Sequence, residues 1–308
     1  MHTTTAQEKR KRLREMMAAP GVIQAAGVAD AANALIVQSV GYPALYISGS
    51  FVNFTHGLPD GGLTMMEIAA RVREIADRID IPVIADADEG FGGVAQLVRT
   101  VHEFELAGAS AIHLEDMATK KHGHPMPIKE ATNRIKAALD ARSDPNFVII
   151  ARTDAMAPWR AGLEQNRPAC EAEAFERCVA YAEAGADMIM VMYPAMDWVR
   201  QYGNRIPKPI LPLYGLNVSH RAPGSDGTDV KGPVSDFTAQ ELEPYNVKLV
   251  IYPVNIVSRT FGFIKREYAK WLQEGIFVAT EQDAKDRWES NVLIGVPEKY
   301  ALLKKYEE

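Results

Sequence analysis

Charged side chains stand at the ends of three short apolar segments of this sequence. They are Asp86 and Asp88 at the end of residues 82–86, Glu115 and Asp116 at the end of residues 111–115, and Arg152 and Asp154 at the end of residues 147–152. Carboxylates that converge on one place repel one another unless a cation neutralises them, and hard oxygen ligands of this kind suit Mg²⁺ or Mn²⁺. The pattern therefore predicts a divalent-metal site, with an ordinary helix cap as the alternative for any single Asp.

A fourth apolar segment, residues 44–48, leads into small residues that could hold an anion. It continues through Tyr46 to Ser48, Gly49 and Ser50, which offer hydroxyl and backbone N–H groups to a carboxylate. Arg152 could add a bidentate ion pair from across the same site. An ordinary strand-to-loop turn is the structural alternative for this segment.

The loop of residues 117–125 is rich in lysine and histidine. It contains Lys120, Lys121, His122, Gly123 and His124. This composition predicts a lid that brings acid–base groups to an anion, with a solvated surface loop as the alternative. A zinc site at the two histidines is disfavoured, because the nearby sequence lacks the soft donor side chains of zinc sites.

These segments belong to a repeating pattern of short apolar runs and amphipathic helices. The runs that we predict as strands are residues 21–28, 44–48, 82–86, 111–115, 147–152, 188–192, 209–213 and 248–252. Apolar residues recur at helical spacing in residues 64–80 and 94–107, and Gly108 and Gly185 are predicted to end helices. The pattern predicts a (β/α)₈ TIM barrel, because no GxGxxG motif follows the first strand to support an open dinucleotide-binding sheet.

In such a barrel the active site is built at the carboxyl ends of the strands, where the charged residues stand. We expect one domain over residues 1–308. Helical patterns near the end of the chain, clearest at residues 265–272 and 284–293, exceed what eight units need. We therefore expect a C-terminal helical extension, about residues 264–308, that contacts a partner subunit. Residues 222–235 are predicted as an irregular excursion between the last two strands.

The composition of the chain excludes several classes of protein. Of the 308 residues, 47% are hydrophobic, and no apolar run approaches the roughly 20 residues that span a bilayer. The formal net charge of −6 argues against a nucleic-acid binder. Cys170 and Cys178 lie in one helical stretch, where we expect them to pack rather than to form a disulfide framework. With a polar N-terminus that does not look like a secretory signal, this composition predicts a cytoplasmic protein with no membrane association.

Several of these motifs together resemble a known group of enzymes. They are YISGS (46–50), GLPD (57–60) within GLPDGGLTMME, DADEGFGG (86–93) and HLEDMATKKHGH (113–124), supported by ARTDA (151–155) and EAGAD (183–187). In these motifs the chain is similar to the isocitrate lyase/phosphoenolpyruvate mutase superfamily. The similarity extends over roughly residues 10–290.

The resemblance implies a barrel that usually forms a homotetramer, in which paired subunits exchange a C-terminal helix. It implies a Mg²⁺ site at Asp86, Asp88 and Glu115, with Asp60 holding a metal-bound water. It also implies that the carboxylate of a small 2-oxo or 2-hydroxy acid is held by Ser48, Gly49, Ser50 and Arg152. Tyr46 matches the tyrosine near the C2 oxygen of the substrate. The candidate catalytic set is Tyr46, Lys121, His122 and Arg152, and the other candidate substrate-binding residues are Gly123, His124 and Asn217.

The sequence departs from the pattern of each branch of the superfamily. Lyases carry a cysteine in the lid, where this chain has His122, and they place a glutamate after the sixth strand that is not evident in residues 192–195. The Lys-x-Asn lid of the phosphonate branch is absent. The end of the seventh strand, through Asn217, is more similar to the oxaloacetate decarboxylase branch, which lacks the lysine-rich lid kept here.

We therefore predict a Mg²⁺-dependent lyase or decarboxylase that cleaves a carbon–carbon bond in a small 2-oxo or 2-hydroxy dicarboxylate. A Lewis acid at the C2 oxygen would stabilise the enolate-like charge that develops in this reaction. An imidazolium at His122 could protonate the departing carbanion. The alternatives are an enzyme that rearranges or hydrolyses phosphonopyruvate, and a 2-oxo acid-binding protein that has lost catalysis.

Overall fold

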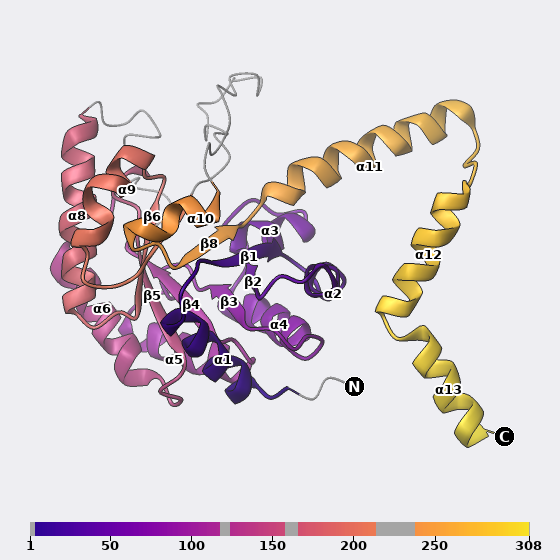
Figure 1. Ribbon diagram of the computed structural model, residues 1–308, viewed down its shortest axis with the longest axis horizontal. Helices are drawn as coiled ribbons and strands as arrows, with labels where there is room; N and C mark the ends of the chain where they lie inside the picture. The colour runs from indigo at the N-terminus through magenta and orange to yellow at the C-terminus, as the bar shows by residue number, and fades with distance from the viewer. Residues whose placement is uncertain (1–3, 118–123, 158–165, 214–237, 308) are drawn as a thin grey trace.

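The protein is built around eight parallel strands that close into a barrel (Figure 1). The computed structural model describes residues 4–117, 124–157, 166–213 and 238–307. The strands are β1 (Ile23–Val28), β2 (Ala44–Ile47), β3 (Val83–Asp86), β4 (Ala111–Glu115), β5 (Val148–Thr153), β6 (Met188–Met192), β7 (Ile210–Leu213) and β8 (Leu249–Tyr252). Each predicted strand is present, with bounds that differ by no more than two residues, which confirms the predicted TIM barrel.

The order of the strands around the barrel follows the chain. The hydrogen-bonded order is β7-β6-β5-β4-β3-β2-β1-β8, and every pair is parallel. A parallel bridge between Ile210 of β7 and Val247, just before β8, joins the two ends of the sheet. All eight carboxyl ends therefore face the same mouth of the barrel.

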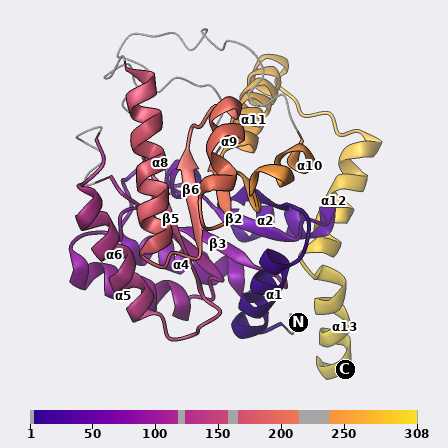
Figure 2. The ribbon, with the colours of Figure 1, turned by 60° about the vertical axis from the view of Figure 1, so that its left-hand side comes forward.

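Helices connect the strands and surround them (Figures 1 and 2). They are α1 (Ala6–Ala18), α2 (Ala31–Val40), α3 (Gly49–Thr55), α4 (Met65–Ala76), α5 (Val94–Leu106), α6 (Ile128–Ala141), α8 (Arg167–Glu183), α9 (Met196–Tyr202), η1 (Gly203–Arg205), α10 (Ala239–Leu242), η2 (Glu243–Tyr245), α11 (Asn255–Glu274), α12 (Glu281–Leu293) and α13 (Val296–Glu307). Gly108 (φ 93°) and Gly185 (φ 103°) follow α5 and α8 in the left-handed region, which confirms their predicted role as helix stops. The predicted excursion at residues 222–235 lies outside the described residues.

Side chains alternate between the barrel interior and the surrounding helices. In β2, Tyr46 belongs to the interior cluster, whereas Leu45 and Ile47 pack against the outer helices. In β5, Ile150 faces inward and Ile149 faces outward. This two-residue period continues to the strand ends, so it decides which charged side chains reach the mouth.

Helix α1 closes the amino-terminal end of the barrel. Leu13 is buried with the interior side chains. The basic residues of this helix bind the turns below the barrel: Lys9 Nζ donates to the Ala76 carbonyl at 2.7 Å, and Arg14 pairs with Asp187 at 2.8 Å. The polar N-terminal segment is therefore part of the fold, a role that its composition did not reveal.

The last three helices form an arm outside the barrel, in which α11 leads away and α12 turns back toward α2 (Figure 1). Helix α11 is continuous across residue 264, and neither α12 nor α13 contains a buried residue. The predicted helical stretches 265–272 and 284–293 lie within α11 and α12. Large apolar side chains are exposed along the arm, namely Phe261, Phe263, Ile264, Tyr268, Leu272, Ile276, Phe277, Val278, Trp288, Val292, Ile294, Tyr300, Leu302 and Tyr306. Among the helices of the described residues, none combines the length and the apolar character needed to cross a membrane.

Candidate active site

Four neighbouring strands bring the candidate residues together at the mouth of the barrel. Tyr46, Asp86, Glu115 and Arg152 all lie at inward positions near the carboxyl ends of β2 to β5. Glu115 and Arg152 are direct partners in the parallel register of β4 and β5. The four side chains therefore lie together at the mouth of the barrel, as the sequence pattern predicted.

The carboxylate of Asp86 joins the end of β3 to the end of β2. Its Oδ2 accepts hydrogen bonds from the backbone N–H of Gly49 at 3.1 Å and from the Tyr46 hydroxyl at 3.4 Å. A Cβ atom on residue 49 would lie 3.0 Å from this same oxygen, so the close approach favours glycine there. The N–H of Gly49, which we predicted to hold a substrate carboxylate, is thus directed at Asp86.

Asp88 stands in an unusual backbone conformation directly after β3. Its φ is 45°, in the left-handed region that Asp and Asn tolerate better than most residues. Its N–H donates to Oδ1 of Asp86 at 3.1 Å, and its carbonyl accepts from the N–H of Glu115 at 2.9 Å. These bonds fix Asp88 between the two other candidate metal ligands.

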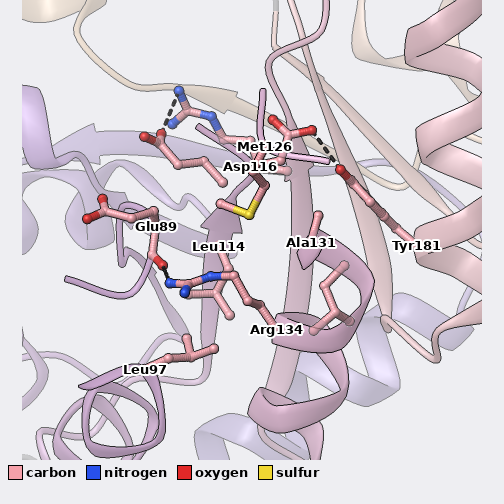
Figure 3. Close-up of a pocket in the computed structure, with 11 residues that line it drawn as sticks. Glu89, Leu97, Leu114, Asp116, Met126, Ala131, Arg134 and Tyr181 are labelled. Carbon is pink, nitrogen blue, oxygen red and sulfur yellow. Dashed lines mark hydrogen bonds and ion pairs between the residues drawn. The ribbon is translucent and has the colours of Figure 1, made fainter. Parts of the chain in front are cut away.

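The loop after Asp88 is held from outside by α6. The Arg134 guanidinium donates to the Glu89 carbonyl and, at 2.7 Å, to the Gly92 carbonyl (Figure 3). A narrow crevice runs behind the mouth from Glu115 and Arg152 to Arg134 (Figure 3). An arginine that the sequence did not single out therefore supports the glycine-rich DADEGFGG segment.

Arg152 is surrounded by carboxylates. Its Nε and Nη2 bind Asp154 at 2.7 and 2.9 Å, and Nη2 also lies 2.9 Å from Glu115. Burial lowers the pKa of the guanidinium, but the charges of Asp154 and Glu115 outweigh it and raise the pKa above its usual value. These contacts engage Nε and Nη2 of the guanidinium.

Glu115 is a buried carboxyl beside other negative charges. Burial raises its pKa well above the usual value, and Arg152 opposes this shift. The carboxylates of Asp154, Asp86 and Asp88 raise the pKa further. A cation at this place would relieve the repulsion, as the sequence pattern predicted.

The donor set suits a hard divalent cation that keeps most of its water. Asp86 and Asp88 are each 8% exposed and Glu115 is 5% exposed, so all three border the mouth rather than open solvent. Among the described residues, no three carboxylate, histidine or cysteine groups lie close enough to hold a metal ion directly. Mg²⁺ commonly binds through one or two carboxylates, with water and substrate oxygens as its other ligands. The residues present fit that mode of binding.

His113 is a site residue that the sequence analysis missed. It is fully buried at an inward position of β4, with Nε2 2.6 Å from the Tyr46 hydroxyl and 3.3 Å from Asp86 Oδ1. Burial raises the pKa of Tyr46 well above its usual value and the Asp86 charge adds to this, so the phenol stays protonated. The signal that could have revealed His113 is its position two residues before Glu115 in the same strand.

We expect His113→Gln to lower kcat by about tenfold or more and to change KM less, because His113 contacts Tyr46 and Asp86 rather than the open mouth. Steady-state kinetics checks this. His102→Gln, an exposed histidine on α5, is the matched control and should retain full activity. Equal kcat for His113→Gln and wild type would exclude a role for His113 in holding Tyr46.

The remaining predicted site residues lie at different depths. Ser48 is buried and its hydroxyl caps α3 by accepting from Phe51 N–H at 3.4 Å, whereas Ser50 is exposed. Asp60 is exposed on the turn after α3, and His124 is exposed before α6. Lys121, His122, Gly123 and Asn217 lie outside the described residues.

Two other groups are turned away from the mouth. Asp116 occupies an outward position after β4 and binds Tyr181 of α8, so it does not join the carboxylates at the mouth. Cys170 and Cys178 are buried on α8, as predicted for packing residues. Burial raises the pKa of the Cys178 thiol well above its usual value, which disfavours the reactive thiolate.

Comparisons with known proteins show the family of the chain. The family model for phosphoenolpyruvate phosphomutase matches residues 13–272 of the chain. A 2-methylisocitrate lyase of Shewanella oneidensis is 36% identical over 252 residues, which are 79% of this chain and 78% of that protein. A 2,3-dimethylmalate lyase of Eubacterium barkeri is 35% identical over 251 residues, with the same coverage of 79% and 78%.

Solved structures share the whole architecture. A phosphonopyruvate hydrolase in complex with oxalate and Mg²⁺ superposes with a TM-score of 0.79 and 25% identity, over 97% of this chain and 99% of that chain. The resemblance read from the sequence motifs is thereby confirmed. From the match of the family model over most of its length and from these relatives, the chain belongs to the phosphoenolpyruvate phosphomutase family, within the isocitrate lyase/phosphoenolpyruvate mutase superfamily.

Proposed function

We propose that this protein is a Mg²⁺-dependent enzyme that cleaves a carbon–carbon bond in a small 2-oxo or 2-hydroxy dicarboxylate in the cytoplasm. The observation that carries the proposal is the cluster at the mouth, where Asp86, Asp88 and Glu115 stand beside the buried cation Arg152. Such a cluster offers one place for a divalent cation and another for a carboxylate. The names of the relatives support a lyase, since they include 2-methylisocitrate lyase and 2,3-dimethylmalate lyase.

Different side chains at the mouth would bind the metal ion and the substrate carboxylate in the proposed reaction. Asp86, Asp88 and Glu115 would hold Mg²⁺ directly or through its bound water, with Asp60 holding one metal-bound water, and Mn²⁺ is an alternative. When bound, the cation would supply Lewis acidity at the C2 oxygen, which stabilises the alkoxide of a 2-hydroxy acid or the enolate that decarboxylation of a 2-oxo acid leaves. Arg152, with Ser48, Gly49 and Ser50, would bind and orient the substrate carboxylate.

Proton transfer is assigned to two other groups. Tyr46, protonated and fixed by His113, would hold a proton near the C2 oxygen of the substrate. In a lyase reaction the 2-hydroxyl of the substrate would lose its proton to a carboxylate at the mouth, and His122, next to Lys121 in the sequence, would protonate the departing carbanion. Gly123, His124 and Asn217 would contact the rest of the substrate. Decarboxylation of oxaloacetate would need no acid for the departing CO₂, only protonation of the enolate.

A second candidate is a reaction on phosphonopyruvate. It is favoured by the similarity to the phosphonopyruvate hydrolase that binds oxalate and Mg²⁺. Separate incubations with phosphonopyruvate, oxaloacetate, 2-methylisocitrate and 2,3-dimethylmalate discriminate the two. We expect Mg²⁺-dependent release of pyruvate from one of the last three and no phosphate from phosphonopyruvate. Phosphate release would overturn the lyase proposal, and tight binding without any product would identify a protein that has lost catalysis.

We further propose a homotetramer in which paired subunits exchange the C-terminal arm. The many exposed large apolar side chains of α11 to α13 support this, because monomeric proteins expose little apolar surface outside interaction sites. Leu272 of α11 is 87% exposed in the isolated chain. We expect Leu272→Asp to dissociate the tetramer in light scattering coupled to gel filtration, whereas Lys270→Asp, an exposed control on the same helix, does not. A monomeric wild-type protein would contradict the proposal.

A further inference from the structure

A buried polar cluster connects α8 to the strand ends behind the mouth. Asp116 is 2% exposed, and its Oδ2 accepts from the Tyr181 hydroxyl at 2.7 Å (Figure 3). The same oxygen accepts from Arg177 Nη1 at 3.3 Å. Burial raises the pKa of Tyr181 well above its usual value, and the charge of Asp116 raises it further. The phenol therefore remains protonated and acts as a donor to Asp116.

The other side of Asp116 holds the segment that contains Arg152. Its Oδ1 accepts from the backbone N–H of Asp154 at 2.9 Å, and its own N–H donates to the carbonyl of Arg152 at 3.1 Å. The Asp154 carboxylate in turn binds the Arg152 guanidinium at 2.7 and 2.9 Å. A continuous chain of hydrogen bonds thus runs from α8 to the cation at the mouth.

Arg177 is itself fixed at several points. Its Nη2 lies 2.7 Å from Glu173, its Nη1 donates to the Met126 carbonyl at 2.8 Å, and it is only 4% exposed. A buried network in which each member has partners keeps one arrangement, because each alternative leaves a polar group without a partner in a low-dielectric environment. Asp116 is therefore presented to Asp154 in one orientation.

We propose that Tyr181 and Arg177 are positioning residues that, through Asp116 and Asp154, set the orientation of the Arg152 guanidinium for a carboxylate ligand. The proposal rests on the proposed function, in which Arg152 binds the substrate carboxylate. Arg152 has two carboxylate neighbours, and Glu115 alone would draw it toward the candidate metal ligands. Holding the Asp154 backbone on α8's side keeps Nε and Nη2 engaged with the Asp154 carboxylate, which would leave Nη1 for a carboxylate ligand.

The test uses the full-length protein and oxalate as the carboxylate probe. We expect Tyr181→Phe, which removes one hydrogen bond to a charged group, to weaken oxalate binding in the presence of Mg²⁺ by about five- to tenfold. KM should rise by a similar factor, while kcat changes less. Tyr202→Phe, a ring on α9 that packs against Phe175 and Trp198, is the matched control and should bind oxalate like wild type. Arg177→Lys should retain part of the oxalate affinity that Arg177→Met loses.

Hydrogen exchange of the Asp154 amide, measured without any ligand, tests the positioning role even if the proposed function is wrong. Faster exchange in Tyr181→Phe than in wild type and Tyr202→Phe, at an unchanged melting temperature, supports the positioning role, even if wild type binds no oxalate and the function itself fails. Unchanged exchange overturns the proposal. So does a lower melting temperature of Tyr181→Phe with unaltered oxalate affinity in a wild type that binds oxalate, because the cluster would then only stabilise the fold.

Discussion

Replacing Asp88 by Asn is expected to lower turnover by about 100-fold or more, because it removes charge from the site where the reaction develops charge. Asn tolerates the φ of 45° at this position as Asp does, so the backbone bonds to Asp86 and Glu115 should be retained. Asp88→Ala should abolish turnover, and it should also strain the backbone, because alanine tolerates a φ of 45° less well than Asp or Asn does. The Mg²⁺ concentration that gives the half-maximal rate should rise by about tenfold or more.

The matched control for Asp88→Asn is Asp140→Asn, an exposed carboxylate on α6. It removes the same charge at a distance from the mouth and should leave both the rate and the Mg²⁺ dependence unchanged. Full activity in a folded Asp88→Asn or Asp88→Ala protein would refute the metal assignment.

Arg152→Lys is expected to raise KM, and the dissociation constant of oxalate, by about 10- to 100-fold. Lysine keeps the positive charge but cannot bind Asp154 through two nitrogens and a substrate carboxylate through a third. The geometry in which Nε and Nη2 engage Asp154 at 2.7 and 2.9 Å would therefore be lost. Isothermal titration with oxalate and Mg²⁺, together with steady-state kinetics, measures the effect.

Arg142→Lys is the control for Arg152→Lys, because it weakens an ion pair of the same kind outside the candidate site. Arg142 binds Asp187 at 2.8 Å at the start of β6, away from the mouth of the barrel. This substitution should lower stability somewhat and leave KM unchanged. If Arg152→Lys also left KM unchanged, Arg152 would be a structural cation and the carboxylate would bind elsewhere.

The strands were predictable because the barrel buries both of their faces. A parallel strand inside a ring of helices needs apolar side chains on successive residues, so β4 and β6 can be read from the sequence residue by residue. The polar residues that interrupt such runs stand out for the same reason. Asp86, Glu115 and Arg152 could thus be placed at the mouth before any contact was known.

The direction of each charged side chain was less evident from composition alone. Glu115 and Asp116 are adjacent, yet the two-residue period turns one to the mouth and the other to α8. The same period identifies His113 as an inward residue. Applied to each strand end, it would have separated the mouth residues from the supporting ones.

Contacts between distant segments could not be predicted from local pattern. The lysines and arginines of α1 resemble those of a solvated helix, but Lys9 and Arg10 are each 3% exposed because they bind carbonyl groups below the barrel. The support of the Asp88 loop by Arg134, and of Asp116 by Tyr181, likewise depends on tertiary packing. Amphipathic spacing identified the C-terminal helices but not the direction in which α11 leaves the barrel.

The most direct test of the proposed function is proton NMR of the protein with Mg²⁺ and a mixture of oxaloacetate, 2-methylisocitrate, isocitrate, 2,3-dimethylmalate and citramalate. A sample with EDTA runs beside it, because oxaloacetate decays unaided. We predict that one component disappears only with Mg²⁺ while pyruvate or glyoxylate accumulates, which would also name the substrate. Identical spectra in the two samples would contradict a Mg²⁺-dependent carbon–carbon lyase acting on this class of acids.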